Sequence, residues 1–253
     1  MSHYDTNLSD SQWEIIEKIM NTKRKRKYSL RLIVDAIIYI TKTGIQWRML
    51  PHDFPKWQLV YYYFNKWAGE GLTEQIHETL VAQSRESKGK KASPSLGLLD
   101  SQSVKTASIT QEKGIDGNKK VQGRKRFIVT DTLGLILAIV VCPANIGERA
   151  GALLVMKELR LKYPRLVKIL ADQGFGGQEF ITMIHKNFAW VLEIVAKVVG
   201  IGGFQVQPIR WVVERTFGWL GFQRRLVRDY EVSTQNSIAF THWAMIRLML
   251  KKF

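Results

Sequence analysis

The sequence predicts an α/β protein in which an all-helical N-terminal part precedes a mixed β-sheet flanked by helices. Apolar residues recur at helical spacing up to about residue 84, and the polar segment from Ser84 to Ser95 then has the composition of a linker. After this linker, apolar runs typical of strands come first in succession and then alternate with helical segments. With 253 residues and 45% hydrophobic content, the chain can bury a substantial core.

Four helices are expected in residues 1–90. The first follows the capping candidates Ser9 and Asp10, and the second spans 30–40 and ends before Gly44, with a basic run at 23–27 between them. The third spans 57–67 and the fourth 72–84. The third helix can form an apolar stripe, while Lys56 and Lys66 face elsewhere. These short helices fit either a helix-turn-helix DNA-binding domain or a plain helical bundle with an aromatic core.

Residues 91–253 are expected to form the α/β domain. Strands are predicted at 96–100, 127–131 and 135–141, followed by a helix at 148–161, a strand at 167–171, a helix at 178–186, a strand at 190–195 and a helix from Pro208 through 222. A meander followed by alternating helices and strands implies a mixed sheet with helices on both faces. The glycine-containing segment 114–123 is expected to be a basic loop between the first two strands.

Composition narrows the class of partner. The chain carries 38 basic and 22 acidic side chains, for a net charge of +16, and this excess favours a polyanion such as nucleic acid or an anionic membrane surface. One cysteine, Cys142, excludes an internal disulfide and a cysteine-based zinc site. No export signal or membrane span is recognised, so a cytoplasmic, nucleoid-associated protein is expected.

Three acidic residues, Asp100, Asp172 and Glu214, interrupt apolar segments where a core would otherwise be expected. If the first and fourth strands are neighbours, Asp100 and Asp172 can approach each other, and a helix packed beside the sheet can bring in Glu214. Three carboxylates are the ligands that Mg²⁺ or Mn²⁺ prefers. Each acid also has a structural interpretation: Asp100 and Asp172 could cap turns, and Glu214 could pair with an arginine of its own helix.

Several motifs in order resemble the DDE transposases of the bacterial insertion sequence 5 family. The most specific is Arg210–Phe217 followed by Arg224–Leu226 and Asp229–Glu231. The other matching segments are Leu8–Trp13, Thr43–Pro51, Leu98–Thr106, Asp131–Leu135 and Ala171–Phe175. The similarity covers nearly the whole chain.

The resemblance implies an RNase H-like core in which Asp100, Asp172 and Glu214 are catalytic and hold two Mg²⁺ ions, with Mn²⁺ able to substitute. It implies nicking at the element's terminal inverted repeats and attack by the freed 3′-hydroxyl on target DNA. A homodimer holding paired ends of double-stranded DNA is the natural assembly. Some relatives carry Tyr and Lys at the positions of Gln207 and Gly221, so contacts to the flanking phosphates must come from elsewhere in this chain.

Basic side chains near these motifs are the candidates for DNA contacts. Arg210 lies four residues before Glu214 and could either steady that carboxylate or bind a phosphate. The basic loop could equally be a plain exposed segment or a DNA contact. The candidates are Arg210, Arg215, Arg224, Arg225, Arg228, Lys105, Lys119, Lys120, Arg124, Lys125, Arg126, Lys56 and Lys66.

Two other functions remain open at this point. A domesticated or decayed relative could bind DNA as a repressor without cutting it, although all three acids are present. A metal-dependent nuclease could cut DNA without joining it to a target.

Overall fold

The computed structural model describes residues 4–20, 27–195 and 209–252. It begins with four helices, as predicted: α1 (Asp10–Ile19), α2 (Leu30–Thr43), α3 (Trp57–Gly69) and α4 (Leu72–Ser87). Ser9 forms a capping box with Gln12 at the start of α1, and Gly44 ends α2 with a φ of 71°. Of the basic run at 23–27, residues 23–26 lie outside the described residues.

A six-stranded mixed sheet follows. Its strands are β1 (Leu96–Lys105), β2 (Gly114–Asp116), β3 (Val121–Thr130), β4 (Ile136–Pro143), β5 (Lys168–Ala171) and β6 (Val191–Ile194). β1 pairs antiparallel with β3 and parallel with β5; β3 also pairs with β2 and β4, and β6 is parallel to β5. The predicted mixed sheet, with the first and fourth expected strands as neighbours, is confirmed.

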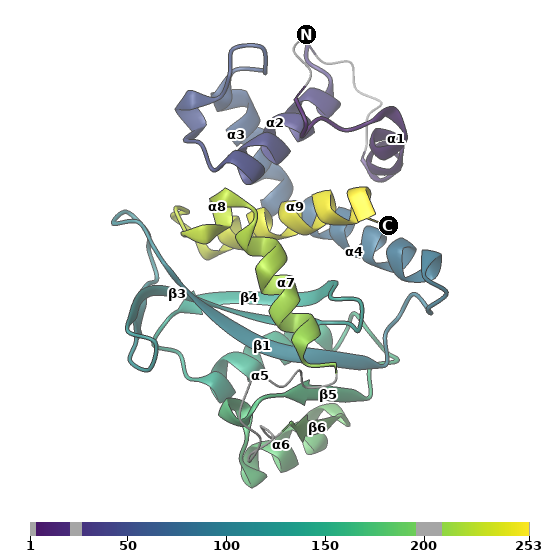
Figure 1. Ribbon diagram of the computed structural model, residues 1–253, viewed down its shortest axis with the longest axis vertical. Helices are drawn as coiled ribbons and strands as arrows, with labels where there is room; N and C mark the ends of the chain where they lie inside the picture. The colour runs from purple at the N-terminus through teal and green to yellow at the C-terminus, as the bar shows by residue number, and fades with distance from the viewer. Residues whose placement is uncertain (1–3, 21–26, 196–208, 253) are drawn as a thin grey trace, which may run out of the picture.

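Helices cover both faces of this sheet, as expected. On one face, α5 (Glu148–Leu159) packs so closely on β3 that a Cβ atom at Gly151 would lie 2.1 Å from the Phe127 ring. On the other, α7 (Trp211–Gly221) contacts β1 and β3 and lies in front of the sheet in Figure 1. A further helix, α6 (Gln178–Phe188), packs on β6.

Three features differ from the expected elements. β1 continues to Lys105 because its second half pairs with β3 from Gly123 onward. The segment 114–123 is largely a β-hairpin, not a loop, because β2 pairs with the start of β3. The short helix α8 (Arg224–Val227) and the long helix α9 (Thr234–Lys252) follow α7, where the predicted order of elements stopped.

Helix α9 joins the two parts of the chain. It packs on α2, α3 and α4 and also on β4, so the last helix lies between the N-terminal helices and the sheet (Figure 1). The predicted linker, 84–95, contains the connection from α4 to β1 at 88–95, but its first four residues belong to α4. Within the described residues, no helix combines the length and apolar character needed to cross a membrane.

Candidate active site

Asp100 and Asp172 come from neighbouring parallel strands. In the register of this pair, Leu98 lies beside Leu170, which places each acid two residues beyond the same pair. Asp100 accepts a hydrogen bond from the backbone N–H of Ser101 at 2.7 Å, and Asp172 accepts one from Gly174 at 2.9 Å. Asp172 thus caps the turn that the sequence allows, whereas Asp100 lies within β1 and caps no turn. The two hydrogen bonds leave carboxylate oxygens available at the edge where β5 ends.

Glu214 lies on α7, and two hydrogen bonds attach this helix to the β3–β4 turn. The Thr216 hydroxyl donates to the carbonyl of Gly134 at 2.8 Å, and Arg215 donates to that of Leu133 at 3.0 Å. Gly134 has a φ of 83°, and a Cβ atom there would meet the Thr216 hydroxyl at 2.8 Å. A glycine is therefore required for this close approach, which sets the position of α7 on the sheet.

Arg210 lies among the three acids. Its Nη2 atom is 3.5 Å from a carboxylate oxygen of Asp172 and 3.6 Å from one of Glu214. The predicted pairing of Arg210 with Glu214 is thus present, and it extends to a second acid. The guanidinium is largely buried, whereas Glu214 is half exposed. The site therefore faces solvent on the side of Glu214.

Asp100 is the least solvated of the three acids. Burial raises the pKa of its carboxyl to about 6, although the hydrogen bond from Ser101 opposes this shift. The negative charge of Asp172 raises the pKa further, while the cations Arg210 and Lys119 lower it. Asp172 is therefore close enough to raise the pKa of Asp100, and a cation near Asp100 stabilises its ionised form.

The donor chemistry of this site suits a hard divalent cation, because all three side chains are carboxylates. In the parts of the chain that the structure describes, no group of three or more His, Cys, Asp or Glu side chains is already arranged to hold a metal ion. Arg210 is the cation that pairs with Asp172 and Glu214 here. The three side chains therefore have the ligand type that a divalent metal needs. Asp172 and Glu214 would turn from Arg210 toward the ion on binding it.

Four of the thirteen predicted DNA contacts are corrected by the structure, because their side chains are buried in the fold. Arg124 pairs with Asp229 at 3.3 Å, and Lys125 pairs with Glu148 at 3.1 Å. Arg126 donates to the carbonyl of Leu226. The fourth, Arg225, pairs with Glu231 at 2.5 Å under the rings of Tyr230 and Phe240. Arg124 and Arg126 thus join β3 to α8 and the residues just after it, Lys125 joins β3 to α5, and Arg225 joins α8 to the residues that follow it. None of these four side chains is exposed in the structure.

Most of the other candidates are exposed. Arg215 is partly buried, stacked between Trp211 at 4.5 Å and Trp219 at 4.6 Å. Lys119 is one of the cations that lower the pKa of Asp100, and it donates to the backbone carbonyl of Ser101 at 3.4 Å. Gln207 lies outside the described residues, and Gly221 ends α7. The fully exposed candidates are Lys56, Lys66, Lys105, Lys119, Lys120, Arg224 and Arg228.

Several motif residues have structural roles that the sequence analysis did not assign. Asp131 forms a buried ion pair with Arg85 of α4 and accepts hydrogen bonds from the backbone of Leu133 and Leu135. Asp229 and Glu231 neutralise the buried arginines described above. The signal was available, since arginines in apolar segments need acidic partners, but the pairing of Arg124 with Asp229 joins residues 105 positions apart in the sequence.

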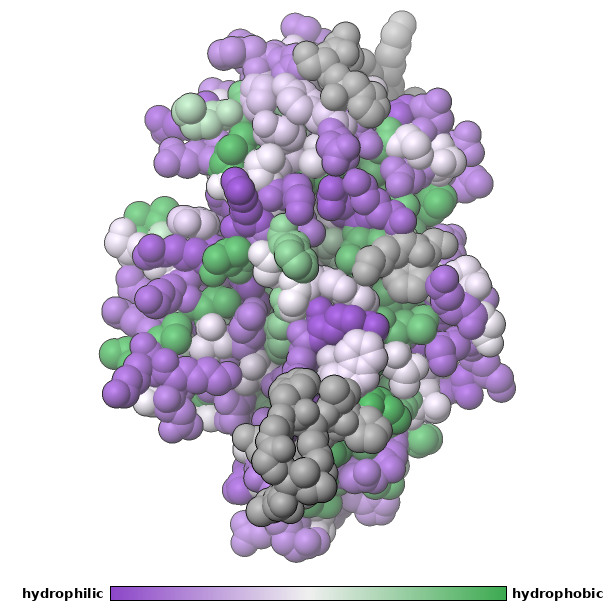
Figure 2. Space-filling view, in the orientation of Figure 1, coloured by the Kyte–Doolittle hydropathy of each residue, from purple (hydrophilic) through white to green (hydrophobic). Residues whose placement is uncertain are grey.

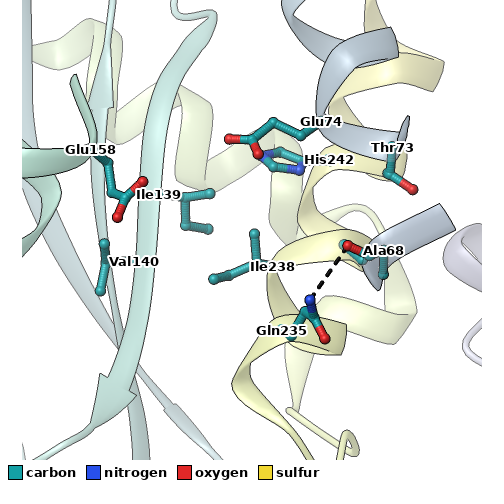
Figure 3. Close-up of a pocket in the computed structure, with 10 residues that line it drawn as sticks. Ala68, Thr73, Glu74, Ile139, Val140, Glu158, Gln235, Ile238 and His242 are labelled. Atoms are coloured by element: carbon teal, nitrogen blue, oxygen red, sulfur yellow. Dashed lines mark hydrogen bonds between the residues drawn. The ribbon is translucent and has the colours of Figure 1, made fainter. Parts of the chain in front are cut away.

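A cavity of about 320 Å³ lies away from the three acids, between β4 and helices α4 and α9. Figure 3 shows Glu74 beside His242 on one side and Glu158 on the other, with Ile139 between them. His242 stacks on His77 with ring centroids 4.7 Å apart. None of the predicted catalytic or DNA-binding residues lines this cavity.

Comparison with known proteins agrees with the sequence resemblance. Residues 91–249 match a family described as "Transposase DDE domain", and residues 8–77 match one described as "Putative transposase of IS4/5 family". A curated protein of Burkholderia cepacia, "Putative transposase for insertion sequence element IS402", is 31% identical over 118 residues. The match covers 43% of this chain and 54% of that relative, so the chain spans about half of the relative's length.

Proposed function

We propose that this chain catalyses the transposition of an insertion sequence, because it belongs to the family of DDE-domain transposases of the IS4/5 type. The proposed reaction is nicking at the terminal inverted repeats, followed by attack of the freed 3′-hydroxyl on target DNA. The observation that carries this proposal is the gathering of Asp172 and Glu214 around Arg210, with Asp100 in electrostatic reach of the same guanidinium.

The proposed architecture is an RNase H-like catalytic domain in residues 91–253, preceded by a helix-turn-helix-like domain in residues 1–90. The parallel neighbours β1 and β5, with β3 and β4 antiparallel on the other side of β1, support the first part. Two exposed lysines at α3, of which Lys66 lies 3.8 Å from Glu70, support the second. Lys56, just before this helix, and Lys66 on it point away from its buried stripe and could reach DNA.

Asp100, Asp172 and Glu214 would hold two Mg²⁺ ions, or Mn²⁺ in their place. Bound there, the ions would supply activation of the attacking oxygen and stabilisation of the leaving oxygen in an in-line displacement. The carboxylates provide oxygen ligands, and the burial of Asp100 strengthens its interaction with any cation. Once Asp172 and Glu214 turn away, the Arg210 guanidinium becomes available to a phosphate beside them. No covalent protein intermediate is needed.

DNA would reach the acids along the exposed side of the site. Lys119, close to Asp100, and Arg215, on the helix of Glu214, are placed to contact phosphates there. Arg224, the first residue of α8, is exposed. Because two ends must be joined to one target, the proposed assembly is a homodimer on double-stranded DNA.

The test uses the purified full chain with labelled duplex DNA from the flanks of its gene, with and without Mg²⁺. Asp100→Asn, Asp172→Asn and Glu214→Gln should each reduce cleavage by at least a hundredfold, while Glu179→Gln, an exposed acid of α6, should not. Mn²⁺ binding followed by electron paramagnetic resonance should weaken in the same three variants. Unchanged cleavage in any of them would refute the metal site.

The alternative is a non-catalytic DNA-binding protein acting as a repressor. It would be favoured if the chain bound the flanking DNA tightly but produced neither nicked nor joined molecules with Mg²⁺ or Mn²⁺. Nicked products without joined ones would instead indicate a nuclease. Product analysis on a denaturing gel separates these three outcomes.

A further inference from the structure

A basic cleft lies at the end of β1, at the opposite end of that strand from the linker. Its volume is about 470 Å³, and it opens between the loop after β1, the β2–β3 hairpin and the residues after α8. Its lining includes four basic side chains, Lys105, Lys113, Lys120 and Arg228, and no acidic residue among those described. In Figure 1 the hairpin and this loop lie at the left of the sheet, and hydrophilic residues cover much of that end in Figure 2.

The walls of the cleft are fixed by hydrogen bonds. Arg228 donates to the carbonyl of Thr106 from Nε at 3.2 Å and from Nη2 at 2.8 Å, which holds its guanidinium in one orientation. Lys113 donates to the carbonyl of Ser108 at 2.8 Å. The backbone of Asp229 pairs with Lys105 and with the residue after Thr106, at 2.9 Å each. The positive groups are therefore largely preorganised, which reduces the entropy lost on binding.

The buried carboxylate nearest in sequence to Arg228, that of Asp229, is engaged by other groups. Asp229 is buried, and its carboxylate is bound to Arg124 at 3.3 Å and to the Ser237 hydroxyl at 2.7 Å. Arg124 also donates to the carbonyls of Gln111 and Val232, at 2.6 and 2.7 Å, and these bonds hold the loop behind the cleft. Four exposed cations thus line one cleft with no ion pair to a carboxylate of the described residues, an arrangement that selects an anion.

Position along β1 indicates which anion. Lys105 lies five residues after Asp100, a distance of about 17 Å at the usual rise of a strand. Duplex DNA rises about 3.4 Å per base pair, so a strand that reaches Asp100 with one phosphate can pass the cleft about five base pairs away. A cleft of about 470 Å³ has the size of a small-ligand site and admits part of one strand.

We infer that this cleft binds backbone phosphates of the DNA strand about five base pairs from the phosphate that reacts. The cleft is separate from the three acids and acts in binding, not in the chemical step. The inference rests on the proposed function for the identity of the strand. It concerns affinity in the absence of divalent metal, so it can fail or hold independently of catalysis.

The first test measures binding to a labelled 30-base-pair duplex in EDTA at several salt concentrations. Lys105→Gln/Lys120→Gln should weaken binding about tenfold and reduce the slope of log affinity against log salt by about 2, because each lost phosphate contact removes about 0.9. Lys157→Gln/Lys186→Gln, exposed on α5 and α6, removes the same charge elsewhere and is the control. Equal losses in the two double variants would overturn the inference.

A second test locates the strand. Cys142 is buried, so Ser108→Cys supplies the reactive thiol for a photo-crosslinker at the mouth of the cleft. Crosslinks to DNA should exceed those from Lys186→Cys on α6 and should fall when Lys105→Gln/Lys120→Gln is added. Absence of this excess would refute a DNA strand in the cleft, even if the first test were positive.

A small free phosphate anion could occupy the cleft in place of DNA phosphates. Calorimetry with inorganic pyrophosphate tests it: binding lost in Lys105→Gln/Lys120→Gln, together with unchanged DNA affinity and no crosslink, would reassign the cleft to a small anion and overturn the DNA inference. If DNA binding behaves as expected but no cleavage is seen with Mg²⁺, the cleft stands and the proposed catalytic function falls.

Discussion

At the scale of single residues, neighbouring positions in a basic sequence have opposite roles. Lys119 and Lys120 are exposed, whereas Arg124 and Arg126 of the same strand pair are among the largest fully buried side chains. The difference arises from partners: Arg124 reaches Asp229 and five backbone carbonyls, which compensate the cost of burying its charge. Charge alone therefore does not identify a DNA contact in this chain.

Replacing Arg124 should lower the stability of the fold, because its side chain is buried and ion-paired. Arg124→Met leaves Asp229 buried without its ion pair, so the free energy of unfolding should fall by about 3 to 5 kcal/mol. Lys120→Met, exposed in the same hairpin, should change it by less than about 0.5 kcal/mol. Urea unfolding of both variants measures the difference, and similar stabilities would contradict the structural role of Arg124.

At the scale of elements, the α4–α9 contact contains two stacked imidazoles. His77 of α4 and His242 of α9 are fully enclosed, and burial lowers the pKa of His242 to about 4 and that of His77 well below its usual value. For His242, the carboxylate of Glu74 opposes this shift and Lys162 adds to it. Lys162 in turn pairs with Glu74 and Glu78 of α4. Both rings are therefore neutral in the folded protein at pH 7.

This contact should make stability depend on pH. An unfolded histidine has a pKa of about 6.5, so between pH 6.5 and pH 4 the unfolded chain binds more protons than the folded one, and the free energy of unfolding falls as pH falls. His242 should contribute a loss of about 2 kcal/mol between pH 7 and pH 5.

The variant His242→Phe keeps a stacked ring without the titrating group, so its loss over the same range should be smaller by that amount. Because Asp100 and the other acids are common to both proteins, their contributions cancel in the comparison. Parallel pH profiles for the two proteins, measured by urea unfolding, would show that His242 does not titrate as the structure requires.

At the scale of the whole molecule, α9 joins the two parts that the sequence separates at the linker. Phe240 of α9 lies 4.4 Å from Phe64 and 5.8 Å from Trp47, ring centroid to ring centroid, and Trp243 contacts Trp67. The core of residues 1–90 is thus completed by the last helix of the chain. The two proposed domains, residues 1–90 and 91–253, therefore share one hydrophobic core through α9.

Unfolding of the full chain should therefore be a single cooperative transition, with calorimetric and van't Hoff enthalpies that agree. Phe240→Ala should lower the free energy of that one transition by about 3 to 5 kcal/mol, because the ring is fully buried. Phe222→Ala, where the ring is 72% exposed, is the matched control. Two separate transitions, with only one shifted by Phe240→Ala, would show that the parts fold independently.

The sequence by itself determined the local elements and the chemistry that they could carry. Ser9 and Gly44 mark helix ends because capping depends on adjacent residues, and apolar runs mark strands because burial has a fixed period. The strand order allowed β1 and β5 to be neighbours, and the structure shows that they pair in parallel, with Asp100 and Asp172 just beyond the same register pair. The family resemblance then indicated which three acids belong together. The match to the DDE transposase domain agrees with the family resemblance.

The tertiary structure decided which charges are internal. The pairing of Arg124 with Asp229 and the position of Arg210 between Asp172 and Glu214 depend on side chains brought together from distant segments. The same holds for α9, whose apolar residues do not reveal that they cover the N-terminal helices. Local spacing determines which helix or strand a residue belongs to. Whether its charge meets a partner or solvent depends on packing between elements, because a buried charge needs a partner. This is why Arg124 and Arg126 are buried while the side chains of the basic cleft are exposed.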